Sequence, residues 1–447
     1  MSSPPINRRQ LLRGAGLTAL GGLSLSAAAC GTPFASGIAG TGAGRHSLAY
    51  WNLLGGGDGV RMVQMQDVYR RSHPDVDLQA VTLAWGNPYY TKVTLATLGN
   101  QPPDVAIAHL TRATILARAG LLEPLDEAEL GRHGLTGDNF TSTAWDKAHT
   151  DGKLYAIPLD THPFVMFYNT DICQKAGLLD TDGTLRSLDG PTALVDAMRA
   201  AKQVTGAYGG VASINNDFAT QWRLFSTLYW QLGGDSLLSN EGTDIVMKDA
   251  LAEQALTYIA NLTVGEKLMP ASVDYGGAIT IFAGGQAGFY FEGDWEVSTF
   301  LTAKTPFSMT RFPNVFGGAY AVQADSHSFV LPRDDKRDDA RRQTILDFVR
   351  SMLDQSKTWA EGGHIPAWRP FQSSDAYDQI KPQSNYKDVA DSVRYDDPAW
   401  YSGSGSDFEN ITGSAIAAVS AGQTSPAEAV SEMRARLTKY ANTAAPV

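Results

Sequence analysis

From residue 47 onwards, the sequence alternates between segments with the spacing of a strand and segments with the spacing of a helix. Strands are predicted at 47–51, 76–81 and 104–108, and helices at 60–71 and 88–98. A β-α-β-α-β order favours a mostly parallel sheet with helices on its faces. The sequence therefore predicts an α/β protein.

The remainder of the chain continues the alternation and then becomes mainly helical. Ser425, followed by Pro426 and Glu428, has the pattern of a capping box at the start of a terminal helix. No internal repeat is visible, and 447 residues suffice for two domains or one large split domain. The other predicted elements are strands at 164–168 and 210–213 and helices at 191–204, 217–232, 249–264 and 335–353.

The N-terminus has the form of an export signal. Arg8, Arg9 and Arg13 precede a small-residue apolar run at 15–29, and the paired arginines indicate the twin-arginine route. Residues 26–31 resemble the bacterial lipobox, in which Cys30 would be acylated, although Ala27 stands where a branched residue is usual. The alternative is ordinary cleavage and release. We expect a signal peptide at 1–29 and a lipidated flexible tether at 30–45, rich in Gly, Ala, Ser and Thr.

Charge and cysteine content exclude several classes of function. The net charge of −11 becomes more negative once the arginine-bearing leader is removed, so no nucleic-acid partner is expected. An uncharged or cationic ligand fits this balance better than a polyanion. Apart from Cys30, the one cysteine is Cys173, which predicts no disulfide and a small buried apolar side chain.

The motifs of several enzyme classes are absent. The loop at 55–59 lacks the pattern of a phosphate cradle, and Asp58 within it would repel an anion. The sequence has no G-x-S-x-G nucleophile elbow, which disfavours a serine hydrolase. It also has no H-E-x-x-H motif and no local cluster of His and Cys, so no metal or other cofactor is expected. A glycosidase needs two facing carboxylates, and Asp160 with Glu292 keeps that alternative open.

Five blocks of sequence are spread across nearly all of the chain after the leader. They are D-G-K-L-Y-A-I-P-L-D-T-H-P at 151–163 with F-Y-N-T-D at 167–171, Q-P-P-D-V at 101–105, F-A-G-G-Q-A-G-F at 282–289, G-D-W at 293–295 and G-H-I-P-A at 363–367. In composition and order, these blocks resemble the family 1 extracellular solute-binding proteins, which are the sugar-capturing subunits of ABC importers. This family resemblance implies a protein that is not an enzyme.

The resemblance implies two α/β lobes joined by hinge crossings, with a ligand cleft between them. Crossings are expected near 158–160, 312–320 and 362–366. Lobe 1 would comprise 46–158 and 320–362, and lobe 2 would comprise 159–319 and 363–447. The lobes would close on a sugar by hinge motion and present it to the membrane permease. The protein is expected to be a monomer, anchored at the extracytoplasmic face of the cell membrane.

A sugar ring offers apolar faces and a rim of hydroxyls, so its site needs aromatic planes and planar polar groups. Trp85 lies in a loop after a strand, and the family counterpart of Trp295 lines the cleft. By resemblance, Trp400 and Tyr401 correspond to a sugar-stacking region. Trp222 and Trp230 lie eight residues apart on one helical face, so one of them is expected in the core. The predicted aromatic ligand residues are Trp51, Trp85, Tyr89, Trp222, Trp295 and Trp368.

Polar candidates gather at the expected crossing and at strand ends. Asp160 and His162 lie at the first crossing, and His109 ends a buried strand at the usual ligand edge. For His327, a structural role and a ligand-binding role both stay open. A glycerophosphodiester is the alternative ligand and would need cationic groups, but only Arg369 is near, which favours a neutral oligosaccharide. The predicted polar ligand residues are Asp58, His109, Asp160, His162, Glu292, Asp294 and His364.

Overall fold

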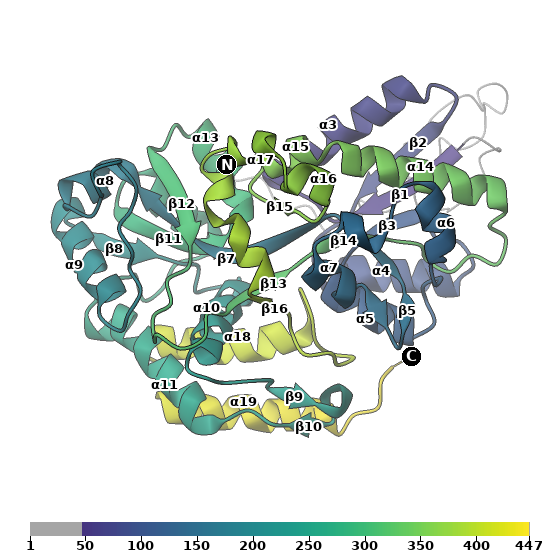
Figure 1. Ribbon diagram of the computed structural model, residues 1–447. Helices are drawn as coiled ribbons and strands as arrows, with labels where there is room; N and C mark the ends of the chain where they lie inside the picture. Colours follow the sequence, from purple (N-terminus) through teal and green to yellow (C-terminus); the bar gives the residue numbers. More distant parts are fainter. Residues whose placement is uncertain (1–46, 447) are drawn as a thin grey trace, which may run out of the picture. The chain divides into compact units, whose positions relative to one another are not determined.

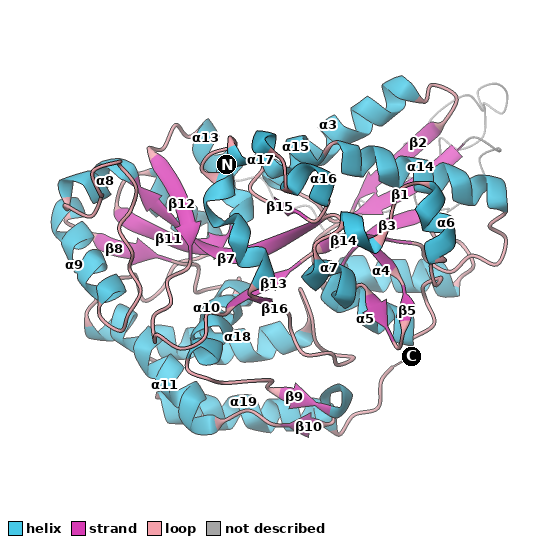
Figure 2. Ribbon diagram, in the orientation of Figure 1, coloured by secondary structure: helices cyan, strands magenta, loops and turns pink. Residues whose placement is uncertain are grey.

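The computed structural model describes residues 47–446 (Figure 1). The predicted signal peptide, the tether and Cys30 lie outside the described residues. Strands fall into two main sheets, each covered by helices (Figure 2). We call the body around the first sheet lobe 1 and the body around the second sheet lobe 2. This two-lobed α/β architecture confirms the predicted fold class.

Lobe 1 is built on a five-stranded sheet in the order β2-β1-β3-β14-β6. The first three strands run parallel, as the β-α-β-α-β pattern predicts, whereas β14 runs antiparallel to both β3 and β6. Its strands are β1 (Ser47–Asn52), β2 (Asp77–Thr82), β3 (Val105–His109), β6 (Ala156–Pro158) and β14 (His327–Val330), and a separate hairpin pairs β4 (His149–Thr150) with β5 (Lys153–Leu154).

The helices of lobe 1 cover this sheet with aromatic and aliphatic side chains. Tyr50 of β1 packs against Phe348, which also contacts the edge of Tyr69. The helices are α3 (Gly56–Ser72), α4 (Asn87–Leu98), α5 (Leu110–Arg118), α6 (Glu127–Arg132), η1 (Gly137–Asn139), α7 (Ser142–Lys147), α14 (Asp339–Asp354) and α15 (Ser356–Ala360).

Lobe 2 is built around one long buried strand, β7, which pairs with four neighbours. The sheet order is β16-β13-β7-β11-β8, with β12 and β15 also pairing with β7. Its strands are β7 (Asp160–Asn169), β8 (Tyr208–Val211), β11 (Ala287–Gly293), β12 (Phe307–Arg311), β13 (Val322–Asp325), β15 (Ile365–Pro366) and β16 (Val393–Arg394), and a small hairpin joins β9 (Leu238–Ser239) to β10 (Asp244–Ile245).

Helices of lobe 2 come from both the middle and the end of the chain. The buried α10 packs against α18, and α18 packs against the terminal helix α19. The capping box predicted at Ser425 and Glu428 is present at the start of α19. The helices are α8 (Thr170–Lys175), α9 (Ala193–Thr205), α10 (Phe218–Gln231), η2 (Asn240–Gly242), α11 (Asp249–Ala260), η3 (Asn261–Gly265), α12 (Tyr275–Ala283), η4 (Asp294–Glu296), α13 (Val297–Thr302), η5 (Gln383–Asp391), α18 (Asp407–Ser420) and α19 (Pro426–Ala441), with α16 (Arg369–Gln372) and α17 (Asp375–Asp378) preceding η5.

The chain passes between the two sheets three times. The first passage, from β6 to β7, falls at Leu159, and the third lies between α15 and β15. The second passage lies at Ser326, because β13 still pairs with β7 while β14 pairs with β3. This is several residues beyond the expected boundary at 320. Trp368, expected in lobe 2, packs with Phe140 in the core of lobe 1.

One predicted loop is helical. Helix α3 begins at Gly56, so most of the glycine-rich segment at 55–59 forms its first turn. Cys173 is free and fully buried in lobe 2, and burial raises the pKa of its thiol to about 12. Within residues 47–446, no helix combines the length and apolarity needed to cross a membrane.

Candidate functional site

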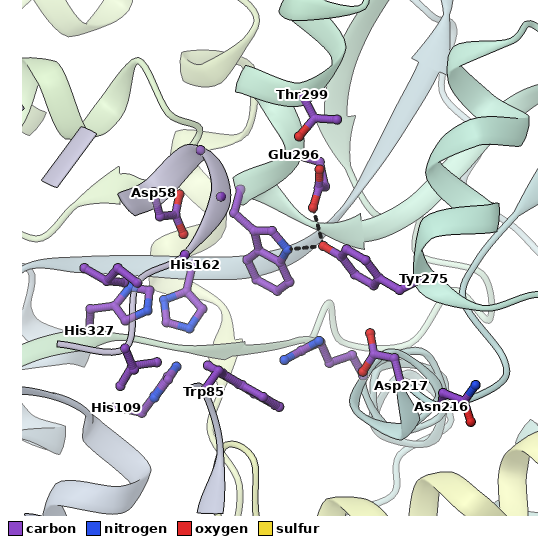
Figure 3. Close-up of a pocket in the computed structure, with 17 residues that line it drawn as sticks. Asp58, Trp85, His109, His162, Asn216, Asp217, Tyr275, Glu296, Thr299 and His327 are labelled. Atoms are coloured by element: carbon purple, nitrogen blue, oxygen red, sulfur yellow. Dashed lines mark hydrogen bonds between the residues drawn. The ribbon is translucent and has the colours of Figure 1, made fainter. Parts of the chain in front are cut away.

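A cavity of about 490 Å³ lies between the lobes (Figure 3). Segments that follow β1, β2 and β3 line it from lobe 1, and the starts of α10, α12 and α13 line it from lobe 2. Such a volume is within the range of small-molecule sites. The lining residues are Leu53, Leu54, Gly55, Gly56, Gly57, Asp58, Trp85, His109, His162, Asn216, Asp217, Arg223, Tyr275, Trp295, Glu296, Thr299 and His327.

The first turn of α3 forms much of the lobe 1 wall. Its backbone passes so close to lobe 2 that a Cβ on Gly57 would lie 2.8 Å from the Cβ of Ser298. Only glycine permits this approach. The turn presents Asp58 to the cavity, as Figure 3 shows. Trp85 adds an indole from the loop after β2, and it is 44% exposed although it is a large apolar group.

The lobe 2 wall is centred on Trp295. A Cβ on Gly293 would lie 1.8 Å from the indole ring, so glycine at that position lets the ring fold back over the end of β11. The indole Nε1 donates to the Tyr275 hydroxyl at 2.8 Å, and that hydroxyl donates to Glu296 (Figure 3). The guanidinium carbon of Arg223 lies 4.9 Å from the centroid of the Trp295 ring, in cation–π range.

Arg223 is also close to a buried acid behind the wall. Its Nη1 lies 3.5 Å from Oε1 of Glu292, which is fully buried and accepts a hydrogen bond from Thr220 at 2.5 Å. Burial, with a smaller contribution from Asp217, raises the pKa of Glu292 to about 8, although Arg223 opposes the shift. Glu292 is therefore largely protonated at neutral pH, which leaves Arg223 as the cation of this wall.

Three imidazoles form the floor of the cavity. His109, at the end of β3, has its Nδ1 2.7 Å from the Tyr90 hydroxyl. His162 and His327 each turn Nδ1 towards Asp160, at 3.0 Å and 2.8 Å respectively. The rings of His162 and His327 are only 4.3 Å apart. The carboxylate beneath them thus fixes the orientation of two rings that face the cavity.

The charges around Asp160 are tightly coupled. Burial favours the neutral acid, but His327, His162 and His364 outweigh it and hold the pKa of Asp160 well below its ordinary value. Burial and the neighbouring His327 lower the pKa of His162 to about 3, so this ring is neutral. Burial would also lower the pKa of His364, but Asp58, Asp294 and Asp160 together raise it to about 10.

Five of the sequence-predicted ligand residues line the cavity. A further four lie directly beneath it and are fully buried, so they support the lining rather than form it: Asp160, Glu292, Asp294 and His364. The carboxylate pair that kept a glycosidase open, Asp160 and Glu292, therefore does not face the cavity. The five lining residues are Asp58, Trp85, His109, His162 and Trp295.

Four predicted aromatic residues are placed in the cores instead of the cleft. Trp51 is buried in the lobe 1 sheet. The Tyr89 hydroxyl donates hydrogen bonds to the backbone carbonyls of Trp51 and Ile107. Trp222 is buried in lobe 2, with its Nε1 donating to Asp396 at 2.9 Å. Trp368 packs within lobe 1. Each of these side chains packs or forms its hydrogen bonds within a lobe core. The structure therefore does not place the four residues at the cavity, contrary to the prediction that they contact the ligand.

Trp400 and Tyr401 also lie away from this cavity. Trp400 lines a second hollow near the C-terminal residues, and Tyr401 is buried, donating to the carbonyl of Gly242 at 2.7 Å. Several lining residues were not predicted from the sequence. Among them, only Asp217 had a recognisable local pattern in the sequence, that of a helix cap at the start of α10. His327, for which two roles were open, lines the floor of the cavity. The missed residues are Asn216, Asp217, Arg223, Tyr275, Glu296 and Thr299.

Comparison with known proteins identifies the family. Residues 51–356 match the model of the bacterial extracellular solute-binding proteins. The chain belongs to this family. The match spans β1 to α15 and so includes most of both lobes.

Individual relatives are distant. The chain is 23% identical over 383 residues to the arabinooligosaccharide-binding protein of Bacillus subtilis, covering 82% of each chain. It is 30% identical over 127 residues to the mannitol-binding protein of Pseudomonas aeruginosa, but this spans only 27% of either chain. The GacH receptor of Streptomyces glaucescens, solved unliganded and with acarbose, superposes with a TM-score of 0.71 at 19% identity, covering 88% of this chain and 98% of that one. This last likeness supports the two-lobed fold.

Proposed function

We propose that this solute-binding protein captures a neutral oligosaccharide of two or more units between its lobes and delivers it to an ABC importer. The observation that carries the proposal is the cavity itself. Lobe 1 contributes Trp85 and lobe 2 contributes Trp295, with Asp58 and Glu296 beside them. Aromatic planes suit the C–H faces of sugar rings, and carboxylates accept hydrogen bonds from hydroxyls.

The charge of the lining favours a neutral ligand over a phosphodiester. Three carboxylates, Asp58, Asp217 and Glu296, line the cavity, against the single guanidinium of Arg223. Burial raises the pKa of Glu296, so part of this negative charge is lost, and Asp58 is paired with His364 at 3.0 Å. Asp217 still lies close enough to Arg223 to interact with its charge. A phosphate would meet one cation that is already surrounded by acids. Hydroxyls would find both donors and acceptors.

Two relatives point to the same chemistry. The Bacillus subtilis relative, which the chain matches over most of its length, is named for an arabinooligosaccharide, and the Streptomyces structure holds acarbose. Reversible binding without turnover is part of the proposal. The buried Asp160 and Glu292 do not reach a ligand in the cavity, so this pair offers no acid–base couple across a glycosidic bond.

Contacts between the lobes support a hinge-closing mechanism. Asn87 of lobe 1 donates to Asp407 of lobe 2 at 3.1 Å, and the Cα of Gly86 lies 2.6 Å from where a Cβ on Gly405 would stand. A sugar that binds the closed form better than an open form would drive closure. The proposed twin-arginine leader and the lipid on Cys30 would hold the protein outside the membrane, near its permease.

The experiment is a thermal-shift screen of purified protein lacking residues 1–30 against neutral di- and oligosaccharides, with glycerophosphodiesters in parallel. A ligand that binds only the folded state stabilises it by about 2.7 kcal/mol at 100 Kd. A shift with a saccharide that is recovered intact supports the proposal. A shift confined to glycerophosphodiesters would contradict the proposal and favour a glycerophosphodiester-binding protein. Recovery of cleaved sugar would contradict it and favour an enzyme.

A further inference from the structure

The three chain passages between the lobes bring four metal-ligating side chains together beneath the cavity. Asp160 and His162 come from the start of β7, His327 from the start of β14, and His364 from the residue before β15. One donor atom from each residue lies within 4.8 Å of the corresponding atoms of the other three. All four side chains are at least 94% buried.

The donors converge on the carboxylate of Asp160. The Nδ1 atoms of His162 and His327 lie 3.0 Å and 2.8 Å from its oxygens, and the Nδ1 of His364 lies 3.4 Å away. These are separations between donor atoms, not metal–ligand distances. A tetrahedral ion with ligands about 2.05 Å away separates its ligand atoms by about 3.3 Å. Movements of about an ångström would therefore give the four donors that spacing.

Buried polar atoms without partners lie at the same place. Among residues 47–446, the Nδ1 of His364 and both carboxylate oxygens of Asp294 make no hydrogen bond although they are fully buried. His364 Nδ1 lies 3.5 Å from Asp294 Oδ1. This separation is within ion-pair range, so His364 offsets part of the cost of burying the Asp294 carboxyl group. The hydrogen-bonding capacity of its two oxygens is nevertheless unused by the described side chains.

The side chains that surround the cluster make contacts of the kind found around metal-bound histidines. His364 places its other ring nitrogen, Nε2, 3.0 Å from Asp58 Oδ1, and its ring stacks on Trp359 at 4.4 Å. Trp359 Nε1 donates to Asp160 at 2.6 Å. A carboxylate on the far nitrogen fixes the ring of a ligating histidine and increases its basicity. Asp58 and Trp359 provide this support.

We propose that Asp160, His162, His327 and His364 form a binding site for one divalent transition-metal ion, best matched by Zn²⁺. Three imidazole nitrogens and one carboxylate oxygen are a donor set that suits zinc. On binding, the ion takes the position of the Nδ1 protons. Each ring then ligates as a neutral imidazole whose proton is on Nε2, so only a ring that was protonated on both nitrogens releases a proton to solvent. Sequence spacing predicted no metal site, because the ligands are distant in the chain and meet only at the passages.

Such an ion would join all three passages between the lobes. His162 and His327 also line the ligand cavity, so the ion would set the orientation of two floor residues. Metal binding is nevertheless separate from sugar binding, since the four ligands require no sugar. Failure of the sugar proposal would leave this proposal standing, and the reverse also holds.

The test uses tag-free protein lacking residues 1–30, stripped with a chelator and titrated with Zn²⁺ by calorimetry. We expect one ion per chain and a rise in melting temperature. Binding should weaken at least tenfold in His327→Gln and His364→Gln. The matched control, His149→Gln, removes a partly exposed histidine of lobe 1 and should bind like the parent. Full-strength binding by the double variant His327→Gln/His364→Gln would overturn the proposal.

A second measurement covers the case in which the buried variants fail to fold. Co²⁺ added to the unmodified stripped protein should give the intense visible bands of a four-coordinate site, and Zn²⁺ should abolish them. X-ray absorption at the zinc edge should then show nitrogen and oxygen ligands at about 2.0–2.1 Å. Weak, six-coordinate cobalt bands, or no zinc retained by the folded protein, would reject the site.

Discussion

Trp295 donates a hydrogen bond from its indole Nε1 to the hydroxyl of Tyr275 at 2.8 Å. The same hydroxyl donates to Glu296, so one phenol connects the aromatic and the acidic parts of the lobe 2 wall (Figure 3). Tyr275 begins α12, whereas Trp295 and Glu296 lie in η4. The contact therefore fixes the plane that a sugar ring would stack on.

Tyr275→Phe should weaken sugar binding. The substitution keeps the ring but leaves Trp295 Nε1 without its acceptor, and a hydrogen bond of this kind contributes roughly 0.5–1.5 kcal/mol. We expect a Kd about two to twelve times higher by calorimetry. Tyr258→Phe is the control, because the Tyr258 hydroxyl is buried in lobe 2 without a hydrogen-bond partner among the described residues. Equal losses in both variants would contradict a specific role for Tyr275.

Asn87→Ala should weaken sugar binding without touching the cavity. Asn87 donates to Asp407 across the lobes, so its loss destabilises the closed form and reduces the closed population. We expect a several-fold faster dissociation rate in stopped-flow experiments. Asn139→Ala is the control, since Asn139 bonds only within lobe 1 through Gly134 and Thr136. An unchanged dissociation rate for Asn87→Ala would count against closure through this contact.

Stability should fall as the pH rises through the neutral range. The pKa of Glu292 is raised to about 8 in the folded protein, from an ordinary value of 4.5. Between these values the native state binds more protons than the unfolded state, so unfolding becomes easier as pH increases. The contribution is complete below about pH 4.5 and is lost through about pH 8.

Glu292→Gln should flatten this decline in urea unfolding measured from about pH 5 to 8. The decline should not vanish, because burial also raises the pKa of Glu409. Glu253→Gln changes an exposed glutamate of α11 and should leave the profile unaltered. Identical slopes in Glu292→Gln and the parent would show that Glu292 does not hold the extra proton.

Cys30→Ser should release the protein from the membrane if the proposed acylation occurs. Cys30 lies outside the described residues, so this prediction rests on the lipobox-like sequence alone. The measurement is fractionation of cells expressing the full chain, followed by immunodetection. The parent protein should sediment with membranes and the variant should be soluble. Membrane retention of the variant would favour another mode of attachment.

Strand and helix positions were largely predictable because their signals are local. The parallel strands β1, β2 and β3 follow directly from the spacing of apolar residues and the intervening helices. The start of α3 was missed, because glycines at 56, 57 and 59 favour a loop. In the structure, this first turn of α3 contacts lobe 2, where Gly57 closely approaches Ser298. Contacts between residues so far apart in the chain cannot be predicted from the local sequence.

The site was only partly predictable, for a geometric reason. Trp222 and Arg223 are adjacent on α10, so their side chains point about 100° apart. Trp222 enters the core and Arg223 the cavity, whereas sequence alone favoured the tryptophan. Trp85 was predictable because it lies in a loop after a strand, and Trp295 because its family counterpart lines the cleft. The histidines meet only when the three passages are brought together.

The most direct measurement of the central claim is calorimetric titration of Trp295→Ala with the saccharide that shifts the parent protein. Losing the stacking surface should cost about 1–3 kcal/mol, which raises Kd roughly 5- to 150-fold. Trp400→Ala is the matched control, because Trp400 lies at the second hollow and packs on Tyr440. We predict that this control binds like the parent. Parent-like affinity in Trp295→Ala would show that the sugar does not bind in this cavity.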